Sequence, residues 1–118
     1  MDKPRLDRHL PLTPVAFEIL LALADGEQHG YRIMQEVDAR SKGRVTLHPG
    51  TLYRALARLL DSGLIEELDE RPSRGDDERR RYYRLTPLGI AVARAEADRL
   101  ASQVASARTR RLLKGARA

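Results

Sequence analysis

Residues 48–68 have the sequence HPGTLYRALARLLDSGLIEEL, in which a helical pattern gives way to a strand pattern. Four leucines of the first part are spaced to share one face of a helix: Leu52, Leu56, Leu59 and Leu60. The opposite face carries Arg54 and Arg58. After Gly63, residues 64–68 form a short, partly alternating apolar run that is typical of a strand. The segment therefore predicts an amphipathic helix from Pro49 to about Ser62, followed by a strand.

Two further helices are predicted before this segment. Thr13-Pro14 joins a capping residue to the proline favoured at the first helical position, and the helix that it starts is apolar nearly all round up to Asp25-Gly26. A helix of that kind is buried on most sides. The second helix opens near His29-Gly30, carries one apolar stripe and ends at residues 41–43. Residues 44–47, which follow, could form one isolated strand.

A hairpin and a long helix are predicted after it. Residues 81–85 form a second strand-like run, separated from the first by the polar residues 69–80, so the two runs predict a β-hairpin with a long charged tip. Thr86-Pro87 repeats the helix-start signal of the first helix. No helix breaker occurs between Gly89 and Gly115, which predicts a final helix of about 25 residues, or ~37 Å.

The order of these elements is that of a winged helix-turn-helix, a mainly α fold with a small β-hairpin. We expect the winged helix-turn-helix, as a DNA-binding domain, over residues 11–86 and a C-terminal dimerisation helix over residues 87–114. In such a fold the second helix of the pair enters the major groove of DNA. Here that helix begins at Pro49, and its face opposite the leucines is polar and cationic. The plain alternative is a solvated helix face that carries two arginines.

The charge of the chain is less informative than the local pattern. The formal net charge is +5, but all 17 acidic residues and 17 of the 22 cationic residues precede residue 101, so the excess belongs to a basic C-terminal tail. That tail either contacts DNA or is a solvated helix end, and we favour the second. The chain has no cysteine, which excludes disulfides, a thiolate zinc site and a cysteine nucleophile. A charged N-terminus without an apolar signal region predicts a cytoplasmic protein.

Several short motifs resemble those of the PadR family of bacterial transcriptional regulators. They occur in family order: His29-Gly30-Tyr31, then residues 49–56 (PGTLYRAL), Gly63-Leu64-Ile65 and residues 81–86 (RYYRLT). The resemblance implies a repressor of stress, detoxification or efflux genes that binds an operator of two-fold symmetry as a homodimer and is released by a small-molecule effector. The short C-terminus resembles the subfamily with a single C-terminal helix.

The resemblance and the helix pattern together suggest which residues bind DNA. Arginine can bind guanine edges in a bidentate manner, hydroxyl groups can hold phosphates, and glycine at a helix start lets the backbone approach a phosphate. The expected DNA-binding residues are Tyr31, Pro49, Gly50, Thr51, Tyr53, Arg54, Arg58, Arg74, Arg79, Arg80, Arg81 and Tyr83. The wing departs from a plainly basic tip, because residues 76–78 are acidic and would repel phosphates unless they pair with arginines.

The final helix carries a heptad-like seam that predicts dimerisation. Its members alternate at spacings of three and four: Ile90, Ala93, Ala97, Leu100, Val104 and Ala107. Residues 88–92 are expected to pack against their own domain instead. From Leu100 onward we expect a partner helix, because a helix of this length extends beyond what one small domain can cover.

The remaining motifs argue against an enzyme, a cofactor or a metal site. The three histidines lie in separate segments, and His29 and His48 fall at helix starts, where capping explains them. Glu66 and Glu67 alternate across a strand and cannot converge on a substrate. No catalytic or phosphate-loop motif is present. The alternative to a DNA-binding regulator is a winged-helix module that binds protein, whose docking face should be apolar.

Overall fold

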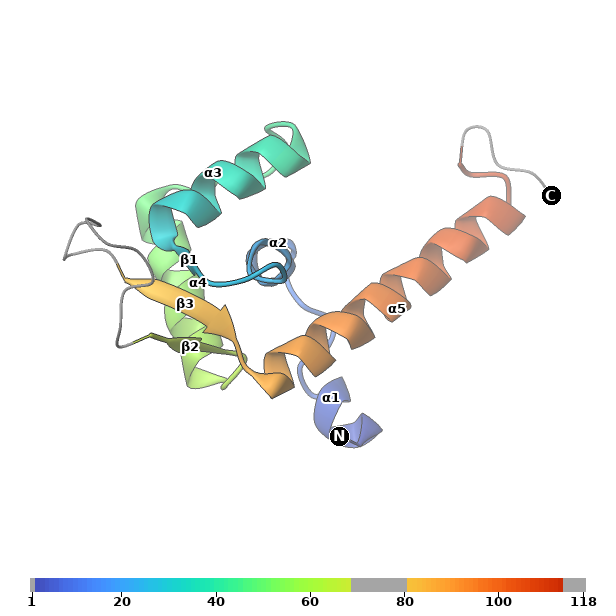
Figure 1. Ribbon diagram of the computed structural model, residues 1–118. Helices are drawn as coiled ribbons and strands as arrows, with labels where there is room; N and C mark the ends of the chain where they lie inside the picture. Colours follow the sequence, from blue (N-terminus) through green and yellow to red (C-terminus); the bar gives the residue numbers. More distant parts are fainter. Residues whose placement is uncertain (1, 69–80, 114–118) are drawn as a thin grey trace.

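The structure is a computed structural model that describes residues 2–68 and 81–113. The elements follow one another along the chain (Figure 1) as α1 (Lys3–Asp7), α2 (Pro14–Ala22), β1 (Gln28–His29), α3 (Gly30–Ser41), α4 (Pro49–Asp61), β2 (Ile65–Glu67), β3 (Tyr82–Leu85) and α5 (Pro87–Thr109). The three predicted helices, the two paired strands and the long last helix are all present. The short α1 was not predicted, because five residues carry no helical period.

Capping residues start the helices where the sequence indicated. The Thr13 hydroxyl accepts a hydrogen bond from the Ala16 amide (3.1 Å), and the Thr86 hydroxyl accepts one from the Gly89 amide (3.0 Å). His29 caps α3 in the same way, its Nδ1 accepting from the amide of Arg32 at 3.2 Å. His48 forms no side-chain cap on α4, so that part of the capping prediction is wrong.

A small antiparallel sheet has the strand order β1-β3-β2. The predicted hairpin pairing is confirmed, with Ile65 opposite Leu85 and Glu67 opposite Tyr83. The third strand is the two-residue β1, which pairs with the other edge of β3 and is too short to show an alternating pattern. The isolated strand predicted at residues 44–47 is wrong. Both backbone groups of Val45 bond to the Ser41 hydroxyl, at 3.0 and 3.2 Å, so they do not need a strand partner.

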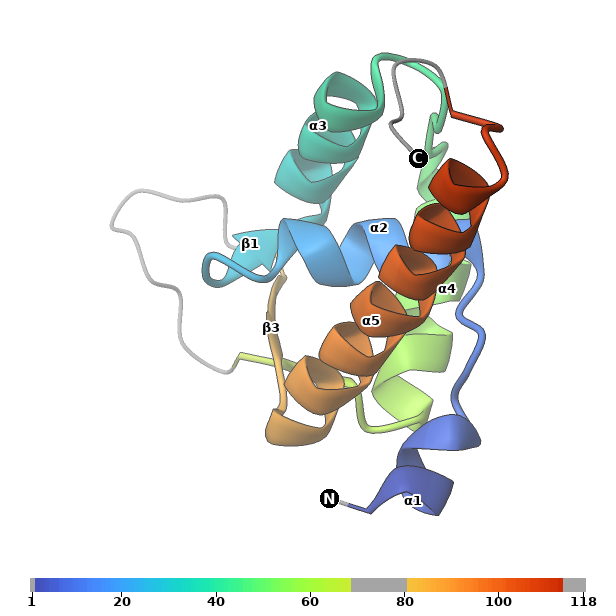
Figure 2. The ribbon, with the colours of Figure 1, turned by 90° about the vertical axis from the view of Figure 1, so that its right-hand side faces the viewer.

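The core lies where α2, α3 and α4 meet above the sheet. Its most deeply buried side chains come from every major element: Ile19, Leu20, Ile33, Val37, Leu52, Leu56, Leu64, Ile65 and Val92. The first half of α5 packs against this core, and Figure 2 shows α5 crossing α2 with α1 below it. From residue 101 to residue 106 every side chain of α5 is exposed. These helices and the three-stranded sheet form a winged helix-turn-helix with a projecting C-terminal helix.

The start of α5 is fixed tightly to the turn between α4 and β2. The Thr86 hydroxyl donates to the Gly63 carbonyl at 2.5 Å, and the Thr86 amide donates to the Leu64 carbonyl at 3.1 Å. A Cβ atom on Gly89 would lie 1.9 Å from that same Leu64 oxygen, so only glycine allows this approach. The direction of α5 is therefore set by backbone contacts to the turn that follows α4.

Candidate nucleic-acid interface

The outer face of α4 presents the predicted polar side chains over a buried leucine stripe. Leu52, Leu56 and Leu59 are at most 4% exposed and hold the helix against the core. Tyr53 on the other side is 51% exposed, and Arg54 and Arg58 are also exposed. Thr51 is half-buried. The structure therefore brings the predicted α4 residues together on one accessible helix face.

The N-terminus of α4 lies open at the end of this face. Because Pro49 has no amide hydrogen and His48 provides no side-chain cap, the first amides of the helix are not satisfied by a capping side chain. Such amides, together with the positive end of the helix dipole, favour an anion. Gly50 adds no bulk there, and a Cβ atom at this position would lie 3.4 Å from Nη1 of Arg54. The guanidinium of Arg54 thus lies beside the first turn.

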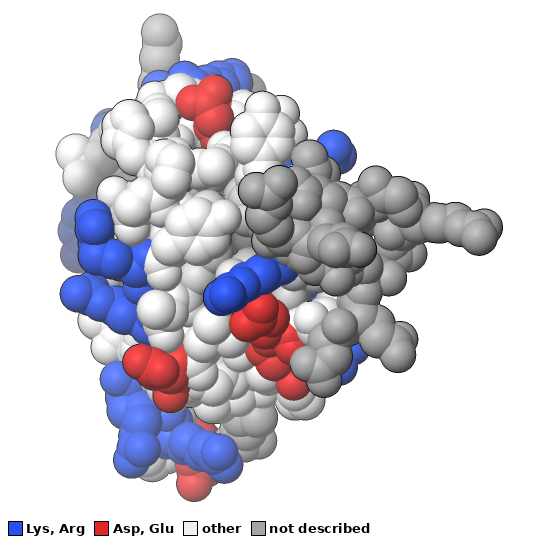
Figure 3. Space-filling view, turned by 90° about the vertical axis from the view of Figure 1, so that its left-hand side faces the viewer, with Lys and Arg blue, Asp and Glu red and all other residues white. Residues whose placement is uncertain are grey.

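Two exposed tyrosines border the same face from α3 and α4. Tyr31 is 57% exposed in the first turn of α3. A Cβ atom on Gly30 would lie 3.0 Å from the Tyr53 hydroxyl, which places that phenol directly against the start of α3. Figure 3 views the molecule from this side: Lys and Arg gather along one edge and at the foot of the face, and a further basic side chain lies near its centre above acidic side chains. The combination of phenols and cations suits contacts with phosphate and base edges.

The arginines of the described segments fall into two groups. Arg40 pairs with Glu18 at 2.6 Å and Glu36 at 3.5 Å, and other arginines pair similarly on the sheet and on α5. Arg81, one of the predicted DNA-binding residues, lies 3.5 Å from Glu67, although its side chain is 70% exposed. By contrast, Arg54 and Arg58 form no ion pair within residues 2–68 and 81–113. Their charges remain available for an external anion.

A groove runs along the side of α4 that faces the N-terminal segment. It has a volume of about 620 Å³, and its lining residues are Arg8, His9, Pro11, Leu12, Thr13, Pro14, Val15, Ala16, Thr51, Arg54, Ala55, Arg58, Leu59, Ser62 and Leu64. Arg8 and His9 were not among the residues predicted from the sequence to bind DNA. No local motif marks them, because only the fold brings residues 8–16 beside α4.

The prediction for Tyr83 needs correction. Its side chain is only 3% exposed and belongs to the hydrophobic core, because β3 is the central strand of the sheet and is covered by helices. Burial raises the pKa of the Tyr83 phenol, and the nearby Glu67 carboxylate raises it further. Tyr83 therefore supports the sheet and does not present its ring to a partner. Of the other wing residues, Arg74, Arg79 and Arg80 lie outside the described residues, as do the acids at 76–78.

The predicted seam on α5 is partly covered by the chain itself. Ala93 packs against the core, whereas Ile90 and Val104 are 40% and 41% exposed. Ala97 is exposed, and Leu100 and Ala107 are half-buried.

Among the described helices none combines the length and the hydropathy that crossing a membrane requires. Within the same residues, no group of His, Asp and Glu is placed to hold a metal ion.

Comparison with known proteins gives consistent matches. Residues 19–95, from α2 into α5, match the model of the transcriptional regulator PadR-like family. The structure of a transcriptional regulator from Clostridium thermocellum is 27% identical, with a TM-score of 0.62 over 90% of this chain and 95% of that one. A PadR family transcription regulator from Clostridium difficile is also 27% identical, with a TM-score of 0.62 over 78% of this chain and 94% of that one.

The chain spans only part of the length of the curated relatives that it matches. An uncharacterized 37.1 kDa protein encoded in a transposon of Streptomyces fradiae is 41% identical over 83 residues, which are 70% of this chain and 22% of that protein. A second relative is matched over 65% of its length. The family match nevertheless covers more than half of the present chain and includes α3, α4 and the paired strands. The chain therefore belongs to the PadR-like family of transcriptional regulators.

Proposed function

We propose that this chain regulates transcription by binding double-stranded DNA through the outer face of α4. One observation carries the proposal: Arg54 and Arg58 are exposed and without an ion pair in the described part of the chain, on a helix whose other face is buried leucine. A cationic helix face beside exposed tyrosines suits the major groove. A protein-docking face would instead be apolar at its centre.

The residues of the interface have distinct expected roles. Arg54, beside the first turn of α4, is placed to contact a base edge, with Thr51 and Tyr53 next to it. Tyr31 borders this face, and both Tyr31 and the exposed Arg81 of the hairpin are assigned to phosphates. We further propose that a homodimer binds an operator with two-fold symmetry, that it represses stress, detoxification or efflux genes, and that a small-molecule effector releases it. Family membership alone supports these three points.

The first prediction tests the assignment of Arg54. Arg54→Ala should cost about 1–3 kcal/mol on a duplex from the upstream region of the chain's own gene, and much less on a random duplex of equal length, because a lost base contact reduces specificity. Arg94→Ala is the control, since Arg94 is exposed on α5 and away from the interface. Gel-shift titrations on both duplexes provide the measurement.

Two results would contradict these assignments. Equal weakening on both duplexes would make Arg54 a phosphate contact and not a base contact. Binding of wild-type protein that does not change with salt would favour a protein-docking module. A DNA-binding interface of about 6–10 phosphate contacts should lose roughly 10³–10⁵ in affinity between about 50 and 200 mM salt.

A further inference from the structure

The groove beside α4 has two walls, which come from two separate segments of the chain. One wall is the N-terminal segment 8–16, and the other is the flank of α4 that carries Thr51, Arg54 and Arg58. Apolar side chains, including Leu12 and Leu59, form much of the lining between the walls. The groove is therefore continuous with the proposed DNA-binding face and extends it towards the N-terminus.

The charges that line this groove all have the same sign. Three arginines contribute to it, namely Arg8, Arg54 and Arg58, and none of its lining residues is a carboxylate. In the ranges 2–68 and 81–113, none of the three arginines forms an ion pair. Hydroxyl groups of Thr51 and Ser62 lie in the same lining. Guanidinium and hydroxyl groups without acids match the chemistry of a phosphodiester backbone.

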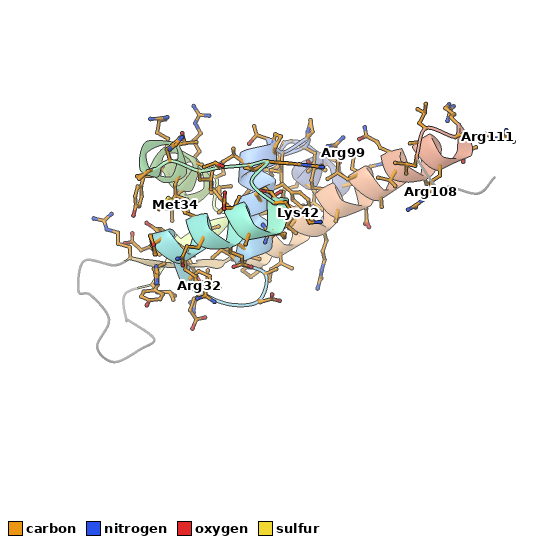
Figure 4. The ribbon with its side chains drawn as sticks, turned by 90° about the horizontal axis from the view of Figure 1, so that it is seen from above. Arg32, Met34, Lys42, Arg99, Arg108 and Arg111 are labelled. Carbon is orange, nitrogen blue, oxygen red and sulfur yellow. The ribbon has the colours of Figure 1, made fainter. Side chains whose placement is uncertain are left out.

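The N-terminal wall is held in place by a buried carboxylate on α5. Glu96 is 1% exposed, and its Oε2 accepts a hydrogen bond from the Leu12 amide at 2.9 Å. Arg99 donates from Nε to Oε1 at 2.5 Å and from Nη2 to Oε2 at 3.1 Å, which neutralises the buried charge. Figure 4 shows Arg99 on the inner part of α5, away from Arg108 near its outer end. Leu12 lies only four residues after Arg8.

We propose that this groove binds the sugar-phosphate backbone flanking the major groove that α4 enters. Arg8 contacts a phosphate, and Glu96 is a positioning residue that fixes the segment bearing Arg8 through the Leu12 amide. This inference rests on the proposed function, because it requires α4 to lie on DNA. It adds a sequence-independent contact through Arg8, which lies outside the family motifs of the sequence.

Arg8→Ala and Arg5→Ala form a matched pair of test variants. Both arginines are exposed and close in sequence, but Arg5 lies on α1 and does not line the groove. On a random-sequence duplex, Arg8→Ala should lower the salt slope by about one and the affinity about eightfold at roughly 0.1 M salt, as expected for one lost phosphate contact. The loss should be equal on the upstream duplex, and Arg5→Ala should leave the slope unchanged.

Glu96→Gln tests the positioning role through a double-mutant cycle. If Glu96 acts by placing Arg8, Glu96→Gln weakens DNA binding in the wild-type background and has no further effect in Arg8→Ala protein. Equal weakening in both backgrounds, or none in either, would overturn this role. Should Glu96→Gln protein fail to fold, the Arg8 and Arg5 pair still decides whether the groove binds phosphate.

The outcomes separate this inference from the proposed function. Wild-type protein that binds DNA, with Arg8→Ala and Arg5→Ala behaving alike, would overturn the groove and leave the proposed function intact. Wild-type protein that binds neither duplex would overturn the proposed function, and the groove with it. An eightfold loss confined to Arg8→Ala supports both.

Discussion

Glu96 shows how one buried charge can make the stability of this fold depend on pH. The paired hydrogen bonds from Arg99 are the main cause of the lowered pKa of Glu96, and the bond from the Leu12 amide adds to them, while burial acts in the opposite direction. The ionised form is therefore favoured in the folded chain relative to the unfolded chain. The stabilisation that ionised Glu96 gives the fold is complete above the ordinary carboxyl pKa of 4.5. It is lost as the pH falls through the lowered pKa of Glu96.

The difference in unfolding free energy between wild type and Glu96→Gln should be largest near about pH 7 and should shrink towards about pH 3, as measured by urea denaturation. Glu66→Gln is the control, since Glu66 pairs with Arg84 at the surface, where both side chains are about half-exposed. Because solvent screens that pair, the difference in unfolding free energy between wild type and Glu66→Gln should be small at both pH values. A Glu96 difference that is constant with pH would contradict the argument.

Individual site residues could be predicted from the sequence only where local pattern determines their position. Arg54 and Arg58 are exposed because they lie opposite the leucines of one helix, which the period of α4 already indicates. Tyr83 could not be placed, because alternation along β3 does not reveal that helices cover the central strand of the sheet. Arg8 and Glu96 could not be singled out from the sequence. The bond between Leu12 and Glu96 joins residues 84 apart, and no local signal encodes such a contact.

At the scale of elements, the junction between α4, β2 and α5 depends on one glycine. We predict that Gly89→Ala destabilises the fold by about 3 kcal/mol or more, because its Cβ would meet a backbone oxygen at 1.9 Å and that oxygen also accepts from the Thr86 amide. Thermal and urea unfolding measure the loss. Gly50→Ala is a matched control near the start of α4, where the nearest atom is a flexible Arg54 nitrogen at 3.4 Å, and it should change stability by less than about 1 kcal/mol. Equal effects of the two substitutions would show that the α5 junction is adaptable.

The elements that could be predicted from the sequence are those that keep a regular pattern over many residues or have strong end signals. α2 and α5 begin at Thr-Pro pairs, and α4 carries its leucine stripe through about two and a half turns. β1 was missed because two residues cannot show alternation, and α1 because its five residues are held by the Asp2 cap and by contact with α5. Residues 44–47 could have formed an isolated strand, but the Ser41 side chain satisfies the backbone of Val45 instead.

At the scale of the whole molecule, the chain is longer than a compact domain of its size. The radius of gyration is 16.0 Å, against about 13.5 Å expected for 118 residues, and the principal extents are 53 × 34 × 23 Å. Figure 1 shows the cause, because the outer half of α5 extends away from the other helices. An isolated helix without packing is marginal in water. A second copy of α5 packed along the exposed seam would supply the missing contacts.

The last prediction follows from this shape. Wild-type protein should be a dimer at micromolar concentration, and Val104→Glu should shift it towards monomer, because the dimer would bury an unpaired charge in the seam beside Leu100 and Ala107. Ser102→Glu introduces the same charge on the opposite side of α5 and should leave the dimer intact. Light scattering over a concentration series measures both. Because two half-sites are bound together by a dimer, Val104→Glu should also weaken operator binding far more than Ser102→Glu does. A wild-type monomer would contradict the dimer itself. Two variants that behave alike would show that this seam does not hold the dimer.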